Sequence, residues 1–177
     1  MKKSIRYTKY IAILIDIVAI WSSVVTPGFV AADTTANSPT TIIKVSGAGV
    51  VNNTDGVSTV DAGEIDPGAV QEVGRRFILT NKGAKPFTLV WLSPSCNCTN
   101  AQLTGPDGRT QTYTWETQQS DVKPVGLGTG QSAIVDVEIE VNSSAPGDFG
   151  KSVLVKIEPN ISRPVLLEVR YRVISRK

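Results

Sequence analysis

The chain has 177 residues, of which 41% are hydrophobic, 19% are charged and 6% are aromatic. This length accommodates one domain with a hydrophobic core, and the apolar content excludes an intrinsically disordered protein. The chain contains no histidine, which excludes Ser-His-Asp and Cys-His catalysis, histidine-ligated zinc and a histidine proton shuttle.

We predict that residues 1–32 form a secretory signal peptide. A basic leader precedes an apolar stretch from Ile11 to Val25, and the small residues Ala31 and Ala32 suit a cleavage after Ala32. Asp16 lies inside the apolar stretch, where a carboxylate disfavours a permanent membrane span by about 2.5–3.5 kcal/mol. The protein is therefore expected to be exported, and periplasmic or extracellular. A membrane anchor formed by an uncleaved signal is the alternative.

Removal of the signal changes the charge balance. Residues 1–32 hold four basic residues and one acidic residue, so the net charge of +2 for the whole chain becomes −1 for the remainder. No basic stripe remains in that part of the sequence. We therefore expect neither nucleic-acid binding nor stable membrane insertion after signal cleavage.

The sequence after the signal divides into a lead-in and one domain. Residues 33–41 are small and polar and are expected to be a flexible lead-in. In residues 42–177 apolar and polar side chains alternate repeatedly, as in half-buried strands, and helical periodicity is absent. In chain order, this alternation predicts strands at 76–80, 87–92, 110–117, 135–141, 153–157 and 165–173.

The strand at 87–92 is apolar on both faces, so we place it near the centre of its sheet. The clearest alternation is at 135–141, where four aliphatic residues face one way and Asp136, Glu138 and Glu140 face the other. Hard cations prefer clustered oxygens, but same-face residues of a strand lie too far apart for one ion to bind all three easily. We interpret the acidic residues as a solvated strand face.

The least regular part is Asn100–Leu127, a long excursion rich in Thr, Gln and Gly. It is expected to contain one strand, 110–117, with Tyr113 and Trp115 on the same face. Trp91 and Trp115 are expected to pack in the core or on a sheet face.

Turn-rich segments separate the strands, and strands at spacings of roughly 8–12 residues indicate an all-β sandwich or barrel. About 130 residues suit a single antiparallel β-sandwich of seven to nine strands.

Two parts of the sequence carry a family resemblance. Phe77–Phe87 has the pattern F-x-L-x-N-x-G, and Pro94–Thr99 ends in S-C-x-C-T. A second part, Gly128–Ala133, precedes the alternating strand and the turn at Gly147–Lys151. With Gly63–Gly68, these segments resemble the bacterial secreted family called Domain of Unknown Function 1573, which is similar to immunoglobulin-like domains of the ASPM, SPD-2 and hydin type.

The resemblance covers roughly Asp61 to Ile174 and implies an immunoglobulin-like sandwich, export across the inner membrane and no established activity. The sequence departs from the family pattern at three places. Asn97 lies between the cysteines where the family has Gly, Thr129 stands where the family has Pro, and Asn100–Leu127 is longer than the family pattern implies.

The two cysteines, Cys96 and Cys98, both lie in the part expected to be exported, where disulfides form. Extended residues two apart have Cα atoms about 6.6 Å apart, at the upper limit for a disulfide, so a bond would need a kinked backbone. Three interpretations stay open. The cysteines are a structural feature such as a local staple, a redox-active dithiol, or a soft-metal site.

The metal interpretation is restricted to Cu(I). Two thiolates can bind Cu(I), whereas a closed zinc site needs about four ligands, and the chain has no further cysteine and no histidine. A copper ion bound at Cys96 and Cys98 would have to be shared across a dimer or have its ligands completed by a partner. No resident cofactor is expected.

Our leading functional hypothesis is a non-enzymatic binding or structural module of the cell envelope. Its partner would be another envelope protein, bound through end loops or a sheet edge. Asn100–Leu127 and Pro94–Thr99 are the expected contact segments. The alternative hypothesis is a thiol-dependent redox or copper-handling protein that uses Cys96 and Cys98.

Overall fold

The computed structural model describes residues 43–141, 145–159 and 164–175, all within one compact unit, Ser38–Lys177. The predicted signal peptide at 1–32 and the lead-in at 33–41 lie outside the described residues.

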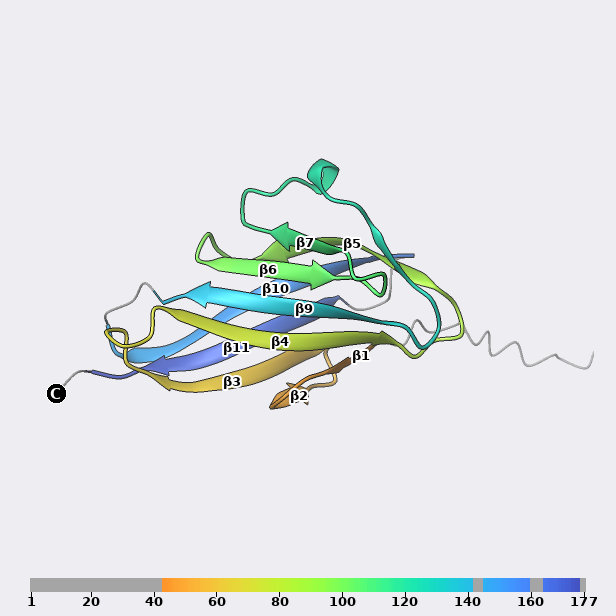
Figure 1. Cartoon of the computed structure of the whole chain (residues 1–177). Coiled ribbons are helices and arrows are strands. Elements are labelled where there is room, and N and C mark those ends of the chain that lie inside the picture. Colours follow the sequence, from red (N-terminus) through yellow and green to blue (C-terminus); the bar gives the residue numbers. More distant parts are fainter. Residues whose placement is uncertain (1–42, 142–144, 160–163, 176–177) are drawn as a thin grey trace, which may run out of the picture. The chain divides into compact units, whose positions relative to one another are not determined.

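The described residues form a sandwich of two sheets (Figure 1). The five-stranded sheet has the order β1 (Ile43–Ser46), β4 (Glu72–Asn81), β9 (Ser132–Glu140), β6 (Thr99–Thr104) and β7 (Thr110–Tyr113). The six-stranded sheet has the order β2 (Val50–Asn52), β3 (Val57–Ile65), β11 (Val165–Val173), β10 (Gly147–Glu158), β5 (Phe87–Pro94) and β8 (Val125–Leu127).

This arrangement confirms the predicted all-β sandwich. Among the described residues, seven strands have six or more residues, and the four edge strands β1, β2, β7 and β8 have only three or four. The total of eleven exceeds the predicted seven to nine because such short edge strands contain too few residues to show an alternating pattern. Short edges also limit the backbone available for unwanted strand pairing.

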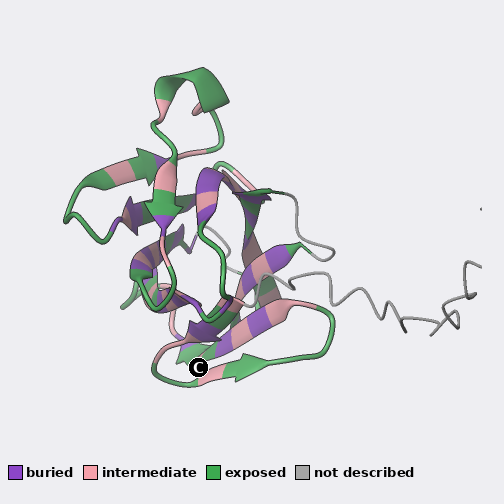
Figure 2. Ribbon diagram, turned by 90° about the vertical axis from the view of Figure 1, so that its right-hand side faces the viewer, coloured by how far each residue is buried: buried purple, intermediate pink, exposed green. Residues whose placement is uncertain are grey.

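The core lies between the sheets and is built by alternation along each strand (Figure 2). In β9, Val135, Val137 and Ile139 are fully buried, whereas Glu138 and Glu140 are exposed. In β11, alternate residues from Val165 to Val173 are buried in the same way. Side chains of the two inner faces therefore form one continuous apolar core.

One strand pair departs from the antiparallel expectation. Strand β3 runs parallel to β11, while every other ladder between described strands is antiparallel. Asp61 pairs with Arg170 and Glu64 pairs with Arg172, so β3 carries one extra residue at this point, a β-bulge. Gly63 occupies the bulge with a φ of +81°, a conformation that glycine adopts without a side-chain penalty.

The expected central position of the strand at 87–92 is wrong. Strand β5 is second from the edge of its sheet, because β8 lies outside it and pairs only with Phe87–Leu89. Leu89 pairs with Ile157 and Trp91 pairs with Lys156, so Val90 lies at an irregularity in the ladder. This bulge interrupts the alternation, which explains why apolar residues occupy both apparent faces of the segment.

Candidate functional site

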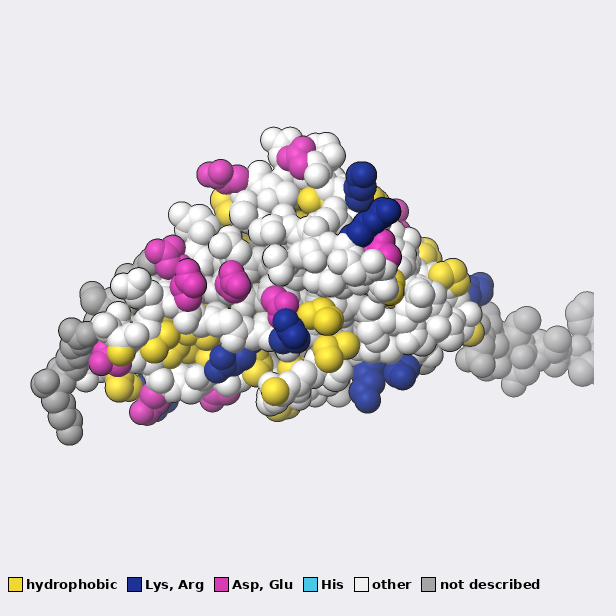
Figure 3. Space-filling model, viewed as in Figure 1, with side chains coloured by type: hydrophobic (Ala, Val, Ile, Leu, Met, Phe, Trp, Pro, Cys, Tyr) yellow, Lys and Arg dark blue, Asp and Glu magenta, His cyan; other side chains and the backbone are white. Residues whose placement is uncertain are grey.

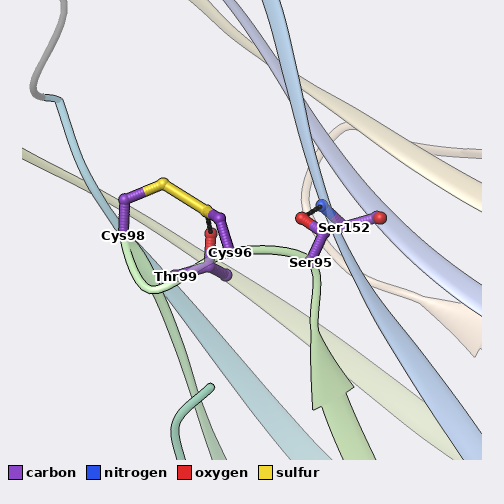
Figure 4. The surroundings of a disulfide bond; sticks show 5 residues. All are labelled: Ser95, Cys96, Cys98, Thr99 and Ser152. Carbon is purple, nitrogen blue, oxygen red and sulfur yellow. Dashed lines mark hydrogen bonds between the residues drawn. A yellow bond between two sulfur atoms is a disulfide. The ribbon is translucent and has the colours of Figure 1, made fainter. Parts of the chain in front are cut away.

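The two cysteines lie where the chain passes from one sheet to the other. Strand β5 ends at Pro94 in the six-stranded sheet and β6 begins at Thr99 in the five-stranded sheet. Cys96 and Cys98 form a disulfide within this short connection, and their Cα atoms are 5.3 Å apart (Figure 4). A turn closed by the hydrogen bond from Thr99 N to Cys96 O replaces the extended backbone and brings the two Cα atoms together.

The backbone of this disulfide turn, residues 95–98, is anchored to both sheets. Ser95 N donates to Ser152 O at 2.8 Å, and Ser152 N donates to Ser95 Oγ at 3.0 Å, which fixes the turn to β10. Glu140 N donates to Cys98 O at 2.8 Å, which fixes it to β9. The turn is therefore a rigid connection, with both cysteines half-buried at its surface.

The disulfide affects the three interpretations of the cysteines differently. In this structure each sulfur is bonded to the other, so two thiolates for Cu(I) exist only after reduction. No group of three metal-ligating side chains occurs among residues 43–141, 145–159 and 164–175. The copper hypothesis requires the reduced form of the turn, whereas thiol exchange can start from the disulfide, and both hypotheses stay predictions.

The excursion from Asn100 to Leu127 contains more structure than the single predicted strand. Strands β6 and β7 form a hairpin closed by hydrogen bonds from Gly105 N to Arg109 O and from Gly108 N to Gly105 O. A short 3-10 helix, η2 (Gln119–Asp121), and strand β8 follow. The excursion thus starts in one sheet and ends at the edge of the other.

The predicted packing of Trp115 is wrong. Strand β7 ends at Tyr113 because Thr114 and Thr117 form a side-chain-supported turn, in which Thr114 N donates to Thr117 Oγ1 at 2.8 Å. Trp115 lies within this turn and is 60% exposed, whereas Tyr113 is fully buried. The sequence signal for the strand end was the pair of threonines three residues apart, which favour such turns.

Trp91 agrees with the expected packing. It is half-buried against the core, and its ring meets the ring of Tyr113 edge-to-face, with centroids 5.9 Å apart. Burial raises the pKa of the Tyr113 hydroxyl. That hydroxyl has no hydrogen-bond partner among the described residues.

The segment 114–121, which we call the knob, extends beyond the edge of the five-stranded sheet (Figure 2). Its return to β8 is fixed by Gln111, whose side chain donates to Lys123 O at 2.7 Å and accepts from Lys123 N at 2.6 Å. Gln118 N donates to the Asp121 carboxylate at 3.3 Å, which closes the turn at η2. Trp115 is therefore presented on a hydrogen-bonded support.

The knob and the disulfide turn leave the same end of the five-stranded sheet. Ala101 pairs with Tyr113 in the β6–β7 ladder, so the turn that precedes Thr99 and the knob that follows Tyr113 start at neighbouring positions. The fold therefore brings one part of the predicted contact segment Asn100–Leu127, the knob, to the same end of the sheet as the predicted contact segment Pro94–Thr99.

On the predicted acidic strand face, the carboxylate of Asp136 forms an ion pair with an arginine. Asp136 accepts from Arg76 on β4 at 2.7 Å, and this contact raises the pKa of the Arg76 guanidinium, first through the hydrogen bond and then through the charge. Glu138 and Glu140 are exposed, and Glu140 lies opposite Glu72 in the ladder. Acidic side chains gather over this part of the five-stranded sheet (Figure 3), which agrees with a solvated face.

A polar hollow of about 670 Å³ lies on β3, β10 and β11. Arg172 donates to the Asp148 carboxylate at 2.6 Å, and Arg170 pairs with Glu168 at 2.9 Å. The hydrogen bond from Arg172, and then its charge, lower the pKa of Asp148. Both guanidinium groups already have acidic partners within the hollow.

Among the described residues, the burial of three polar side chains was not predicted: Ser58, Asn81 and Thr99. Asn81 carries the most contacts. Its side chain donates to Lys85 O and to Leu127 O, each at 2.9 Å, and accepts from Gly83 N at 2.9 Å. The available signal was the N-x-G spacing between two predicted strands, because Asn side chains support turns of this kind.

Comparison with known proteins shows the fold only. No family model matches the chain, and no curated protein matches it. A family 123 glycoside hydrolase from Clostridium perfringens is similar to it in structure, with a TM-score of 0.51 and 12% identity over 77% of this chain. This chain spans only 27% of that hydrolase, about a quarter of its length.

Two further solved structures have lower scores. A PapD-like domain of human CEP192 has a TM-score of 0.44 and 12% identity, and the match covers 78% of this chain and 89% of that domain. The CupB6 tip adhesin of Pseudomonas aeruginosa has a TM-score of 0.42 and 10% identity, over 72% of this chain and 43% of that one. Within the described residues, no helix has the length and apolar character needed to cross a membrane.

Proposed function

We propose that the chain is a non-enzymatic binding module of the bacterial cell envelope, exported by its N-terminal signal and related to the Domain of Unknown Function 1573 family. Its partner is another envelope protein, which contacts the knob and the adjoining disulfide turn. The absence of histidine from the sequence supports a binding role over histidine-dependent acid–base catalysis.

The observation that carries this proposal is the exposure of Trp115. A tryptophan supplies a large apolar area with a polar N–H, and such residues are enriched among those that dominate binding energy at protein interfaces. Trp115 is 60% exposed on a segment whose ends are fixed by the Thr114–Thr117 turn and the Gln111–Lys123 contacts. A fixed support lowers the entropy lost on binding.

The knob is polar around this tryptophan. It contains Glu116 and Asp121 and no basic residue. A partner surface with an apolar pocket rimmed by basic or hydrogen-bonding groups therefore complements it best.

A point substitution tests the proposal better than a deletion. Removal of residues 104–124 would take away Tyr113, which is fully buried in the core, and would confuse loss of fold with loss of binding. Trp115→Ser changes only an exposed side chain in the knob. Val51→Ser is the matched control, because Val51 is 70% exposed on β2, outside the predicted contact segments.

The full chain, with an affinity tag at its C-terminus, is expressed in a bacterium that exports it and is purified after mild crosslinking of intact cells. We expect the wild type and Val51→Ser to recover the same envelope protein, and Trp115→Ser to recover at least about tenfold less. Equal recovery by all three proteins would refute the role of the knob. Recovery only from the cytoplasmic fraction would refute the envelope location.

A further inference from the structure

The disulfide contributes little to holding the fold together. Ser95 already fixes the chain on one side of it to β10 (Figure 4). On the other side, the Cys98 carbonyl accepts a hydrogen bond from Glu140 N on β9. None of these hydrogen bonds involves a sulfur atom. The bond closes a loop with a single residue between the cysteines, and such a short loop removes little entropy from the unfolded chain.

The disulfide is also placed where other molecules can reach it. Cys96 and Cys98 are half-buried, and Asn97 between them is exposed. Inert structural cysteines are typically fully buried, whereas cysteines that exchange thiols are partly accessible. Position and energetics together favour a chemical role over a structural one.

The two sulfurs have different surroundings. The hydroxyl of Thr99, a residue with no exposed surface, lies 3.1 Å from Cys96 Sγ. A disulfide sulfur has no hydrogen, so the Thr99 hydroxyl is the donor in this contact. No hydrogen bond reaches Cys98 Sγ from the described residues. When the bond breaks, negative charge on Cys96 is therefore stabilised by the Thr99 hydrogen bond, whereas no described residue donates a hydrogen bond to Cys98 Sγ.

We propose that the Cys96–Cys98 bond is a thiol-exchange site that oxidises a protein dithiol, with Cys98 as the attacked sulfur and Cys96 as the leaving thiolate. A better-stabilised thiolate leaves faster, which gives the exchange this direction. Thr99 acts as a positioning residue for the leaving sulfur. This activity goes beyond the binding role proposed above and does not depend on Trp115.

The exchange balances in two steps. A thiolate of the partner attacks Cys98 Sγ, a mixed disulfide forms, and the electron pair of the broken bond goes to Cys96 Sγ. The second thiolate of the partner then attacks the partner's first sulfur, which is bonded to Cys98 in the mixed disulfide. This step forms a disulfide in the partner and releases Cys98 as a thiolate. The partner dithiol loses two electrons and two protons, and the two cysteines of this chain gain them as two thiols.

The first experiment uses the exported full-length protein with its disulfide intact and needs no variant. Glutathione is added first, an excess of N-ethylmaleimide then stops the exchange after a short interval and alkylates the freed cysteine, and fragmentation mass spectrometry locates both adducts. We expect glutathione on Cys98 and the maleimide on Cys96. Glutathione on Cys96, or no adduct at either cysteine, would overturn the proposal.

The second experiment measures the rate of reduction by dithiothreitol. Thr99→Val keeps the shape of the buried side chain but removes the hydroxyl, and we expect reduction about tenfold slower than in the wild type. Thr99→Ser restores a hydroxyl and should recover most of the rate. Near-UV circular dichroism confirms the fold of each variant. Equal rates for Thr99→Val and the wild type would remove Thr99 from the mechanism.

The third measurement separates this activity from the binding role and from a structural role. The reduced protein should keep the near-UV spectrum and urea midpoint of the oxidised one, and Trp115→Ser should be reduced at the wild-type rate. Unfolding on reduction would show that the bond is a structural staple, and would leave the binding proposal untouched.

Discussion

The side chain of Asn81 donates a hydrogen bond to the carbonyl of Leu127, 46 residues further along the chain, at 2.9 Å. Asn81 ends β4 in the five-stranded sheet, and Leu127 ends β8 at the edge of the six-stranded sheet. The asparagine of the F-x-L-x-N-x-G pattern therefore joins the two layers where the excursion returns to the sandwich.

Asn81→Ala should destabilise the fold strongly. The substitution removes the fully buried side chain that partners Leu127 O, Lys85 O and Gly83 N, and the bonds to Leu127 O and Gly83 N are themselves buried. We expect a loss of about 2–4 kcal/mol in the free energy of unfolding, measured by urea denaturation. Asn100→Ala is the matched control, because Asn100 is exposed on β6, and it should change stability by less than about 0.5 kcal/mol. Equal effects of the two substitutions would contradict the structural role of Asn81.

Much of the fold was predictable because burial imposes a period of two on long strands. The alternation at 135–141 and 165–173 identified β9 and β11 and the faces that they bury. Strand ends and bulges were less predictable, since they depend on local contacts. The bulge at Val90 places apolar residues on both apparent faces of β5, so the sequence pattern did not reveal that β5 lies next to the edge of its sheet. The Thr114–Thr117 turn ends β7 before Trp115.

The candidate site was only partly readable from the sequence. The sequence identified the cysteine segment and the excursion as contact segments. It did not show that the disulfide turn and the knob lie at the same end of the five-stranded sheet, because that depends on the tertiary pairing of Ala101 with Tyr113. The Thr99 hydroxyl was missed because its role depends on a turn that brings it to Cys96. Spacing alone predicted that a kink was needed to close the disulfide, and left its formation open.

Tyr113→Phe should leave stability unchanged or raise it at neutral pH. The hydroxyl of Tyr113 has no partner among the described residues, and removal of an unsatisfied buried hydroxyl relieves a desolvation penalty of about 1–3 kcal/mol. The ring contact with Trp91 is retained. Chemical denaturation at pH 7 checks this, and a clear loss of stability would indicate that the hydroxyl has a partner.

The same residue predicts an alkaline limit to stability. Burial raises the pKa of Tyr113 above its ordinary value of 10.0, so the folded state retains the proton more strongly than the unfolded state. The contribution of the protonated Tyr113 to the free energy of unfolding is therefore complete below pH 10. It is lost as the pH rises through the pKa of Tyr113 in the folded state. Tyr113→Phe should flatten the decline in unfolding free energy above pH 10, and an identical decline in both proteins would assign the effect to other groups.

Arg172→Gln should raise the pKa of Asp148. The hydrogen bond from Arg172, and then its charge, hold the pKa of Asp148 below the ordinary value of 3.8. The ionised Asp148 therefore stabilises the fold above pH 3.8, and this stabilisation is lost as the pH falls through the pKa of Asp148 in the folded state. Titration of the Asp148 carboxyl by NMR checks the shift. Arg76→Gln is the control, since Arg76 contacts Asp136 on the other sheet and should leave the Asp148 titration unchanged.

Copper binding provides a separate test of the cysteines. If the reduced turn binds Cu(I), the dithiol form should take up the ion, and the disulfide form and Cys96→Ser should not. Anaerobic titration followed by intact mass spectrometry measures the stoichiometry. The copper hypothesis fails if Cys96→Ser binds as much copper as the reduced wild type.

The most direct test of the binding proposal places a photo-crosslinking side chain, p-benzoylphenylalanine, at position 115 of the full chain in living cells, and at position 51 as the control. The proposal predicts one dominant adduct of defined mass from position 115, containing an exported envelope protein, and no such adduct from position 51. Irradiated cells that yield only the uncrosslinked chain at position 115, or the same adducts from both positions, would contradict it.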